Sequence, residues 1–234
     1  STGHVEVVKL LLNNKADFNI CDKGGHTPLY IASQNGHDKV VKLLVLAGAD
    51  LHIANTEYGG VPLGVAAEKG HIETVKVLLE GKVNVNHQDK TGWTALYCAS
   101  RSPDSNIEVV RLLLEHNAGV DICTKGGLSP VYAASTNGRT DIVDLLIQAK
   151  ADIDLATTEL GSVPLGVAAQ NGHYTTVSRL LEAKANINHK NKLGWTPLYC
   201  ATQYGNVDVV RLLVDKRATI NIICDKHLSI NRMV

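Results

Sequence analysis

The side chains best suited to chemistry in this chain are five cysteines, ten histidines and two tryptophans. The histidines are scattered, and the sequence has no His-Glu-x-x-His, Gly-x-Ser-x-Gly or Gly-x-x-x-x-Gly-Lys pattern. Those patterns would set zinc ligands on one helix face, a nucleophile on a tight turn, or phosphate-binding amides in a loop. We therefore expect that this segment is not an enzyme and that it holds no cofactor and no metal.

The cysteines form two sets of equivalent positions, with no Cys-x-x-Cys pair. Cys21, Cys123 and Cys224 make one set and Cys98 and Cys200 the other, and neighbours within a set lie 101 or 102 residues apart. Three stacked helical layers would separate neighbours by about 30 Å, whereas a disulfide needs Cα atoms within about 7 Å. We expect small buried apolar residues inherited by duplication, with no bridge.

The whole chain is repetitive, with a short period of 33 to 35 residues and a long period of 102. The long period pairs Trp93 with Trp195. The short period is marked by one tripeptide in each unit: Thr27-Pro28-Leu29, Val61-Pro62-Leu63, Thr94-Ala95-Leu96, Ser129-Pro130-Val131, Val163-Pro164-Leu165 and Thr196-Pro197-Leu198. Periods of this length predict stacked units, which bind other molecules on a long face rather than in a central cavity.

One unit, residues 22–54, shows how each repeat is expected to fold. Its opening Asp-Lys-Gly-Gly favours a turn. Thr27 is suited to cap a helix that begins at Pro28 and ends before Gly36. A second helix follows with Val40, Val41, Leu43 and Leu44 on one side. Two helices this short are stable only when repeats stack.

These motifs, Thr-Pro-Leu-x-x-Ala, Gly-His, Val-Val-x-Leu-Leu and Gly-Ala-Asp, resemble the ankyrin repeat. The resemblance covers nearly the whole chain and implies an all-α solenoid of helix-turn-helix units with β-turn or hairpin fingers. We expect one domain over 1–234. Its parts are a partial repeat at 1–21, full repeats at 22–54, 55–88, 89–123, 124–156, 157–190 and 191–223, and a partial repeat or tail at 224–234. Because both ends cut through a repeat, we expect a fragment of a longer array.

Two repeats depart from the family pattern at the place where ankyrin repeats usually carry histidine. That place holds Tyr30, Tyr97, Tyr132 and Tyr199 in four repeats, but Gly64 and Gly166 in the other two. We expect the tyrosines to be structural, each with a hydroxyl that meets neighbouring backbone. Each glycine leaves a notch beside a finger lengthened by one residue. Shared ancestry or a recurring pocket would explain the coincidence.

Composition restricts the partners. Lys plus Arg equals Asp plus Glu, 23 each, which argues against nucleic acid and anionic membranes because both attract clustered basic charge. The sequence has no long apolar stretch and no signal-like N-terminus, so we expect no membrane insertion. We expect a monomer that binds protein partners in the cytoplasm, with the nucleus as the alternative.

In ankyrin repeats, fingers and inner helices line a concave groove where partners usually bind. The resemblance therefore implies partner-binding residues at these positions: Lys23, Glu57, Tyr58, Lys90, Trp93, Arg101, Lys125, Leu128, Glu159, Leu160, Lys192, Leu193, Trp195 and Tyr204. Trp93 and Trp195 are the expected anchors, because Trp and Tyr dominate interface energetics. Alternatively, they cover the lengthened fingers at Tyr58 and Leu160 and serve stability.

The leading hypothesis is a non-catalytic protein-binding scaffold. A regulatory or mechanical tether within a larger enzyme or channel is the alternative. The resemblance also suggests asparagine hydroxylation at repeat junctions, for which Asn86 and Asn188 are the matching positions.

Overall fold

The computed structural model describes residues 4–220. The chain divides into two compact units, residues 1–125 and 126–234, which we call unit 1 and unit 2 and describe separately. Residues 4–220 contain thirteen α-helices and no β-strand, so the expected all-α class is confirmed. The predicted partial repeat at 224–234, including Cys224, lies outside the described residues, as do residues 1–3.

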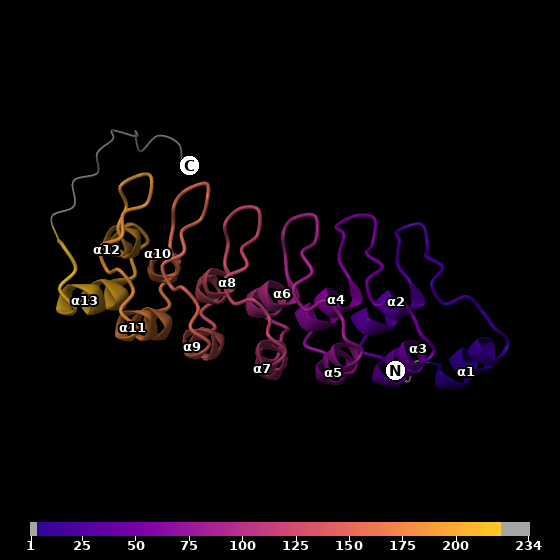
Figure 1. Ribbon diagram of the computed structural model, residues 1–234. Coiled ribbons are helices and arrows are strands. Elements are labelled where there is room, and N and C mark those ends of the chain that lie inside the picture. The colour runs from indigo at the N-terminus through magenta and orange to yellow at the C-terminus, as the bar shows by residue number, and fades with distance from the viewer. Residues whose placement is uncertain (1–3, 221–234) are drawn as a thin grey trace. The chain divides into compact units, whose positions relative to one another are not determined.

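Each repeat contributes an inner helix of seven residues and an outer helix of nine (Figure 1). In unit 1 the inner helices are α2 (Pro28–Gln34), α4 (Pro62–Glu68) and α6 (Ala95–Arg101), and the outer helices are α1 (Val5–Asn13), α3 (Asp38–Leu46), α5 (Ile72–Glu80) and α7 (Ile107–Glu115). In unit 2 the inner helices are α8 (Pro130–Thr136), α10 (Pro164–Gln170) and α12 (Pro197–Gln203), and the outer helices are α9 (Thr140–Gln148), α11 (Tyr174–Glu182) and α13 (Val207–Asp215).

Inner helices begin where the sequence predicts. The Thr27 side chain accepts a hydrogen bond from the Tyr30 amide at 3.1 Å, and Pro28 takes the first helical position. Thr94, Ser129 and Thr196 cap α6, α8 and α12 in the same way. Valine replaces the capping residue at α4 and α10 and offers no acceptor, so these two helices begin without a side-chain cap.

The core of each unit lies between consecutive repeats. On α3, Val40, Val41 and Leu44 are buried, as the apolar stripe predicts, whereas Leu43 is only partly buried. Inner helices pack on inner helices and outer on outer: α2 on α4 and α4 on α6 in unit 1, α8 on α10 and α10 on α12 in unit 2. Leu29, Leu63 and Leu96 are almost completely buried in this stack. Stacking thus stabilises helices too short to persist alone.

Fingers project from the inner helices on the side away from the outer helices in each unit (Figure 1). The finger of ordinary length at residues 89–93 closes with an Asp side chain: Asp89 Oδ1 accepts from the amides of Thr91 and Trp93, both at 2.8 Å. Neighbouring fingers are joined by backbone bonds, such as Lys90 N to Tyr58 O at 2.8 Å. These bonds hold the finger side chains at fixed positions above the inner helices.

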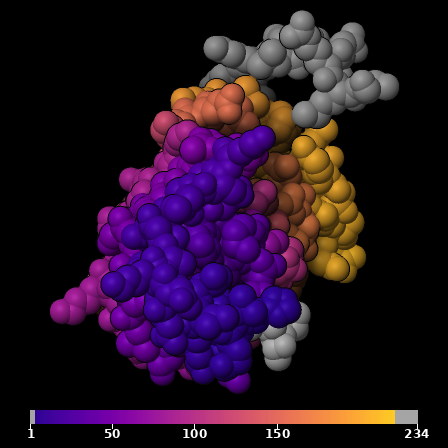
Figure 2. Space-filling view, turned by 90° about the vertical axis from the view of Figure 1, so that its right-hand side faces the viewer, coloured from indigo at the N-terminus to yellow at the C-terminus, as the bar shows by residue number. Residues whose placement is uncertain are grey.

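Figure 2 views unit 1 from its α1 end, drawn in indigo. Val7, Leu10 and Leu11 of α1 are each more than half exposed there. No helix in the described part of the chain is both long enough and apolar enough to span a lipid bilayer.

Candidate functional site

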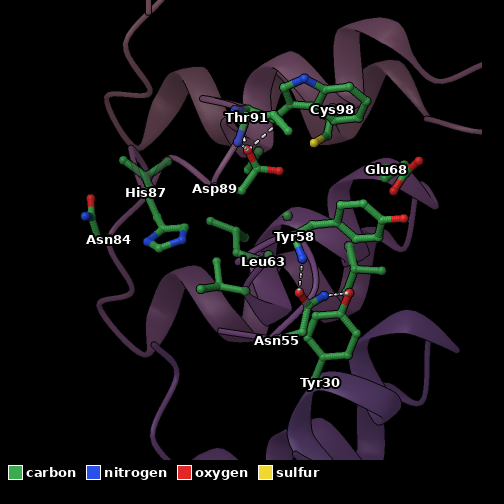
Figure 3. Close-up of a pocket in the computed structure, with 17 residues that line it drawn as sticks. Tyr30, Asn55, Tyr58, Leu63, Glu68, Asn84, His87, Asp89, Thr91 and Cys98 are labelled. Atoms are coloured by element: carbon green, nitrogen blue, oxygen red, sulfur yellow. Dashed lines mark hydrogen bonds between the residues drawn. The ribbon is translucent and has the colours of Figure 1, made fainter. Parts of the chain in front are cut away.

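The lengthened finger and the glycine of α4 together border a pocket of about 330 Å³ in unit 1 (Figure 3). An ideal Cβ placed on Gly64 would meet no heavy atom within 4 Å, so the missing side chain leaves open space. Tyr30, Tyr58 and Trp93 contribute aromatic rings to the lining. The predicted notch is therefore part of a larger apolar recess.

Asn55 holds the lengthened finger in shape. Its buried side chain accepts from the amides of Tyr58 at 2.9 Å and Gly59 at 3.0 Å, and donates to the Tyr30 hydroxyl at 3.0 Å. In Figure 3 these bonds join Tyr30, Asn55 and Tyr58 on one side of the pocket. The expectation that the tyrosine hydroxyl would meet neighbouring backbone is wrong for Tyr30, because the partner is the amide side chain of the next finger.

Trp93 is half-buried and is positioned by contacts on its own repeat. Asp89 binds its backbone amide, and its ring lies 5.2 Å from the Tyr97 ring, centroid to centroid. The Arg101 guanidinium carbon lies 4.9 Å from the centroid of the indole, within the range of a cation–π contact. The indole is thus oriented before any ligand arrives.

Two carboxylates, Glu68 at the end of α4 and Asp89 in the next finger, also line the pocket. The negative charges of both carboxylates affect the pKa of Cys98, which lines the same pocket. Burial first, and then the charges of Glu68 and Asp89, raise the pKa of the Cys98 thiol to about 12. Burial also raises the pKa of Tyr30, although the Asn55 hydrogen bond opposes it, and Glu68 adds a smaller increase. A neutral thiol this far from deprotonation is a poor nucleophile.

Unit 2 repeats the arrangement 102 residues later with a much smaller cavity of about 20 Å³. Tyr132, Gly166, His189, Trp195 and Cys200 line it at the places of Tyr30, Gly64, His87, Trp93 and Cys98. Leu160 replaces Tyr58, Gln170 replaces Glu68, and Asn191 replaces Asp89. The two lengthened repeats therefore carry pockets that differ in size and in charge.

The structure brings only some of the predicted site residues together. Tyr58 and Trp93 line the unit 1 pocket, and Trp195 lines the unit 2 cavity. Leu160 and Tyr204 are about half exposed, whereas Leu128 and Leu193 are more buried. The charged positions are all exposed: Lys23, Glu57, Lys90, Arg101, Lys125, Glu159 and Lys192. The ammonium groups of Lys90 and Lys192 donate to the carbonyls of Thr56 and Thr158, which draws them along the fingers.

The predicted partner-binding set does not include Asn55, Glu68 or Asp89, all of which line the unit 1 pocket. For Glu68 and Asp89, the signal that could have found them is the 102-residue alignment. Within two otherwise similar repeats, it substitutes a carboxylate by its amide twice, at 68 against 170 and at 89 against 191. Paired changes of this kind mark a local difference in charge.

Several histidines and the junction asparagines Asn86 and Asn188 have structural partners. The Nε2 atom of His71 lies 3.0 Å from the carbonyl oxygen of Gln34 in the preceding repeat, and the Nε2 atom of His87 lies 3.0 Å from the carbonyl oxygen of Gly59 within its own repeat. Asn86 Oδ1 accepts from Gly119 N, and Asn188 Oδ1 from Thr219 N, both at 2.8 Å. Among residues 4–220, no group of three or more His, Cys, Asp or Glu side chains is arranged to hold a metal ion.

Comparison with known proteins agrees with this architecture. A family model for ankyrin repeats (three copies) matches residues 1–55, 46–126, 63–157 and 131–224. A probable serine/threonine-protein kinase of Dictyostelium discoideum is 35% identical over 158 residues, which is 66% of this chain and 19% of that protein. Protein phosphatase 1 regulatory subunit 27 of Mus musculus is 39% identical over 56 residues, 24% of this chain and 36% of that protein.

A human relative extends the range of protein classes. The transient receptor potential cation channel subfamily A member 1 is 42% identical over 52 residues, 21% of this chain and 5% of the channel. The chain thus spans about a third or less of the length of these relatives. The repeated capped inner helices, the stacked outer helices and the family match over most of the sequence lead to one conclusion: this chain belongs to the ankyrin repeat family.

Proposed function

We propose that the chain is a non-catalytic protein-binding scaffold that contacts its partner through fingers and inner helices, with Tyr58 and Trp93 of unit 1 at the centre of the contact. Ankyrin repeats are generally protein–protein interaction modules, and the fold is typically non-catalytic. The observation that carries the proposal is the 330 Å³ pocket, whose wall combines three aromatic rings with finger backbone.

The exposure of the aromatic residues supports this function. Tyr58 is 55% exposed. If its ring served only the fold, burying it would stabilise the folded state. Trp and Tyr are enriched among residues whose truncation costs an interface 2 kcal/mol or more. A recess already formed and already lined by such residues avoids part of the ordering cost of binding.

The test begins with linear peptides selected from a random display library against the whole chain, and the tightest peptide serves as the probe. Trp93→Ala with Trp195→Ala should weaken its binding by about thirtyfold or more, as expected for loss of an interface anchor. Tyr58→Leu, which copies the unit 2 residue, should weaken it by about threefold to tenfold. Calorimetry gives the affinity and circular dichroism the helical content.

The matched control changes exposed residues of the outer helices. Lys42→Ala with Glu115→Ala lies on α3 and α7 and should leave peptide affinity unchanged. Binding that survives the tryptophan pair but is lost with the outer-helix pair would reject the proposed surface. The Tyr58→Leu variant keeps the test informative even if the tryptophan pair destabilises the fold.

A second candidate is a regulatory or mechanical tether within a larger enzyme or channel. The observation in its favour is that the relatives include a probable kinase and a cation channel, each much longer than the matched segment. The coding sequence on either side of this segment tests it. An adjoining kinase or channel domain would support the tether, and flanks made only of further repeats would reject it.

A further inference from the structure

The unit 1 pocket carries a charge that its duplicate lacks. Glu68 and Asp89 line it, whereas Gln170 and Asn191 stand at the same places of unit 2. No lysine or arginine lines the unit 1 pocket. A third acidic residue, Glu57, precedes the lining residue Tyr58 in the finger, and its carboxylate raises the pKa of the Tyr58 hydroxyl.

The basic side chains nearest in sequence are directed elsewhere. Lys69, which follows Glu68, lies 4.0 Å from the Asp104 carboxylate, and Lys90, which follows Asp89, donates to the Thr56 carbonyl. The Arg101 guanidinium lies over the Trp93 ring, and Arg101 is not part of the pocket lining. The lining of the apolar recess therefore contains the carboxylates of Glu68 and Asp89, whereas the cation Arg101 lies outside it.

The aromatic wall suits a positive charge as well. Trp is the aromatic side chain that binds cations best through its ring face, followed by Tyr and Phe. The contact of Arg101 with Trp93 shows that this indole accepts a guanidinium. Basic side chains also carry an apolar stem, which matches the lining contributed by Val61, Leu63 and Val65.

We propose that the unit 1 pocket receives a basic side chain, lysine or arginine, from an extended segment of the partner protein. The stem lies over Gly64 and the apolar floor, and the charged head lies between the aromatic rings and the carboxylates of Glu68 and Asp89. This inference rests on the proposed function, because the side chain is presented by a protein. Unit 2, with amides and a 20 Å³ cavity, does not share the preference.

The experiment uses the whole chain labelled with fluorotryptophan, in which Trp93 and Trp195 give two fluorine NMR signals, assigned with Trp195→Phe. The probes are the blocked amino acids N-acetyl-arginine methylamide and N-acetyl-lysine methylamide. Their neutral counterparts, made from citrulline and norleucine, are the ligand controls. We expect the basic probes to shift the Trp93 signal saturably in the millimolar range. The neutral probes should bind about tenfold more weakly, and the Trp195 signal should not saturate.

The decisive variant is Glu68→Gln with Asp89→Asn, which gives unit 1 the residues of unit 2. Asn191 already supports its finger by accepting from Leu193 N at 2.9 Å and Trp195 N at 3.0 Å, so Asp89→Asn keeps the turn. We expect about a tenfold loss of affinity for both basic probes, equivalent to about 1.4 kcal/mol. Glu80→Gln with Glu115→Gln makes the same charge change on the outer helices and should have no such effect.

Each outcome decides the proposal. It is overturned by equal shifts from arginine and citrulline probes, by an unchanged affinity in the Glu68→Gln, Asp89→Asn variant, or by tighter binding of the free diamine putrescine than of the blocked lysine. Failure of the proposed function looks different. If no selected peptide depends on Trp93 while the arginine probe still binds, the cation preference stands without the scaffold. If peptides depend on Trp93 but not on the carboxylates, the scaffold stands without the preference.

Discussion

The pocket of unit 1 and the cavity of unit 2 are formed by equivalent repeats, but their volumes are about 330 and 20 Å³. Both follow a finger lengthened by one residue, both border a helix that begins after valine without a side-chain cap, and both keep Gly, Trp and Cys at equivalent positions. A glycine notch beside a tryptophan therefore does not by itself make a pocket. What distinguishes unit 1 is the set of side chains that shapes its edge.

The main structural difference lies at the start of the lengthened finger. Asn55 links Tyr30, Tyr58 and Gly59 through one side chain, whereas Thr157 forms one side-chain bond, from Ser162 N to its hydroxyl at 3.0 Å. Tyr58 further adds an aromatic wall where Leu160 offers none. The comparison indicates that duplication preserved the fold of the repeat while a few substitutions changed what its surface can hold.

The largest expected effect comes from removing Asn55. Its side chain is nearly buried and makes three hydrogen bonds, each worth about 1 kcal/mol net. Asn55→Ala should therefore lower the free energy of unfolding of unit 1 by about 2 to 3 kcal/mol. Thr157→Ala in unit 2 should cost about 1 kcal/mol. Urea unfolding followed by Trp93 fluorescence in a Trp195→Phe background reports unit 1, and circular dichroism reports the whole chain.

Asn55→Thr is the matched control, because it installs the residue of unit 2. We expect a loss of about 1 to 2 kcal/mol, smaller than for alanine, since one hydroxyl remains to accept a finger amide. Equal losses for Asn55→Ala and Thr157→Ala would contradict the view that Asn55 organises the unit 1 finger.

The repeat pattern predicted most of the fold because it depends on local chemistry. Thr27 and Pro28 fix the start of α2, and Val40, Val41 and Leu44 fix the buried face of α3, as expected. The size of a pocket depends instead on how distant side chains meet. The sequence offered the proximity of Trp93 and Tyr58 only as one alternative, and no period in it states that the Tyr30 hydroxyl bonds Asn55.

A smaller effect is expected from alanine at the two inner-helix glycines. Glycine within a helix costs about 0.5 to 1 kcal/mol relative to alanine. A Cβ on Gly64 meets nothing within 4 Å, and on Gly166 only Val163 Cγ2 at 3.9 Å, an ordinary contact. Gly64→Ala and Gly166→Ala should each raise the free energy of unfolding by about 0.5 to 1 kcal/mol. If Gly166→Ala lowers the free energy of unfolding while Gly64→Ala raises it, the unit 2 cavity has no room for a methyl group at position 166.

The smallest effect expected is on the reactivity of the two helical cysteines. Burial raises the pKa of Cys200 to about 11, while burial together with Glu68 and Asp89 raises the pKa of Cys98 to about 12. Because only the thiolate is alkylated, both cysteines should react slowly near pH 9, and Cys98 should be the slower of the two, although Cys200 is the more buried from solvent. Both rates should rise with pH. Cys21 is exposed, so the expectation of a buried residue is wrong at this position, and Cys21 should react before either.

Glu68→Gln isolates the share of this difference that comes from charge. Removing one carboxylate lowers the pKa of Cys98, so alkylation of Cys98 by iodoacetamide should accelerate about twofold while that of Cys200 stays constant. Mass spectrometry of peptides from a timed reaction measures both cysteines in the same sample, and Glu80→Gln serves as the control for net charge. An unchanged Cys98 rate would show that burial alone separates the two sites and that the field of the unit 1 carboxylates does not reach the pocket wall.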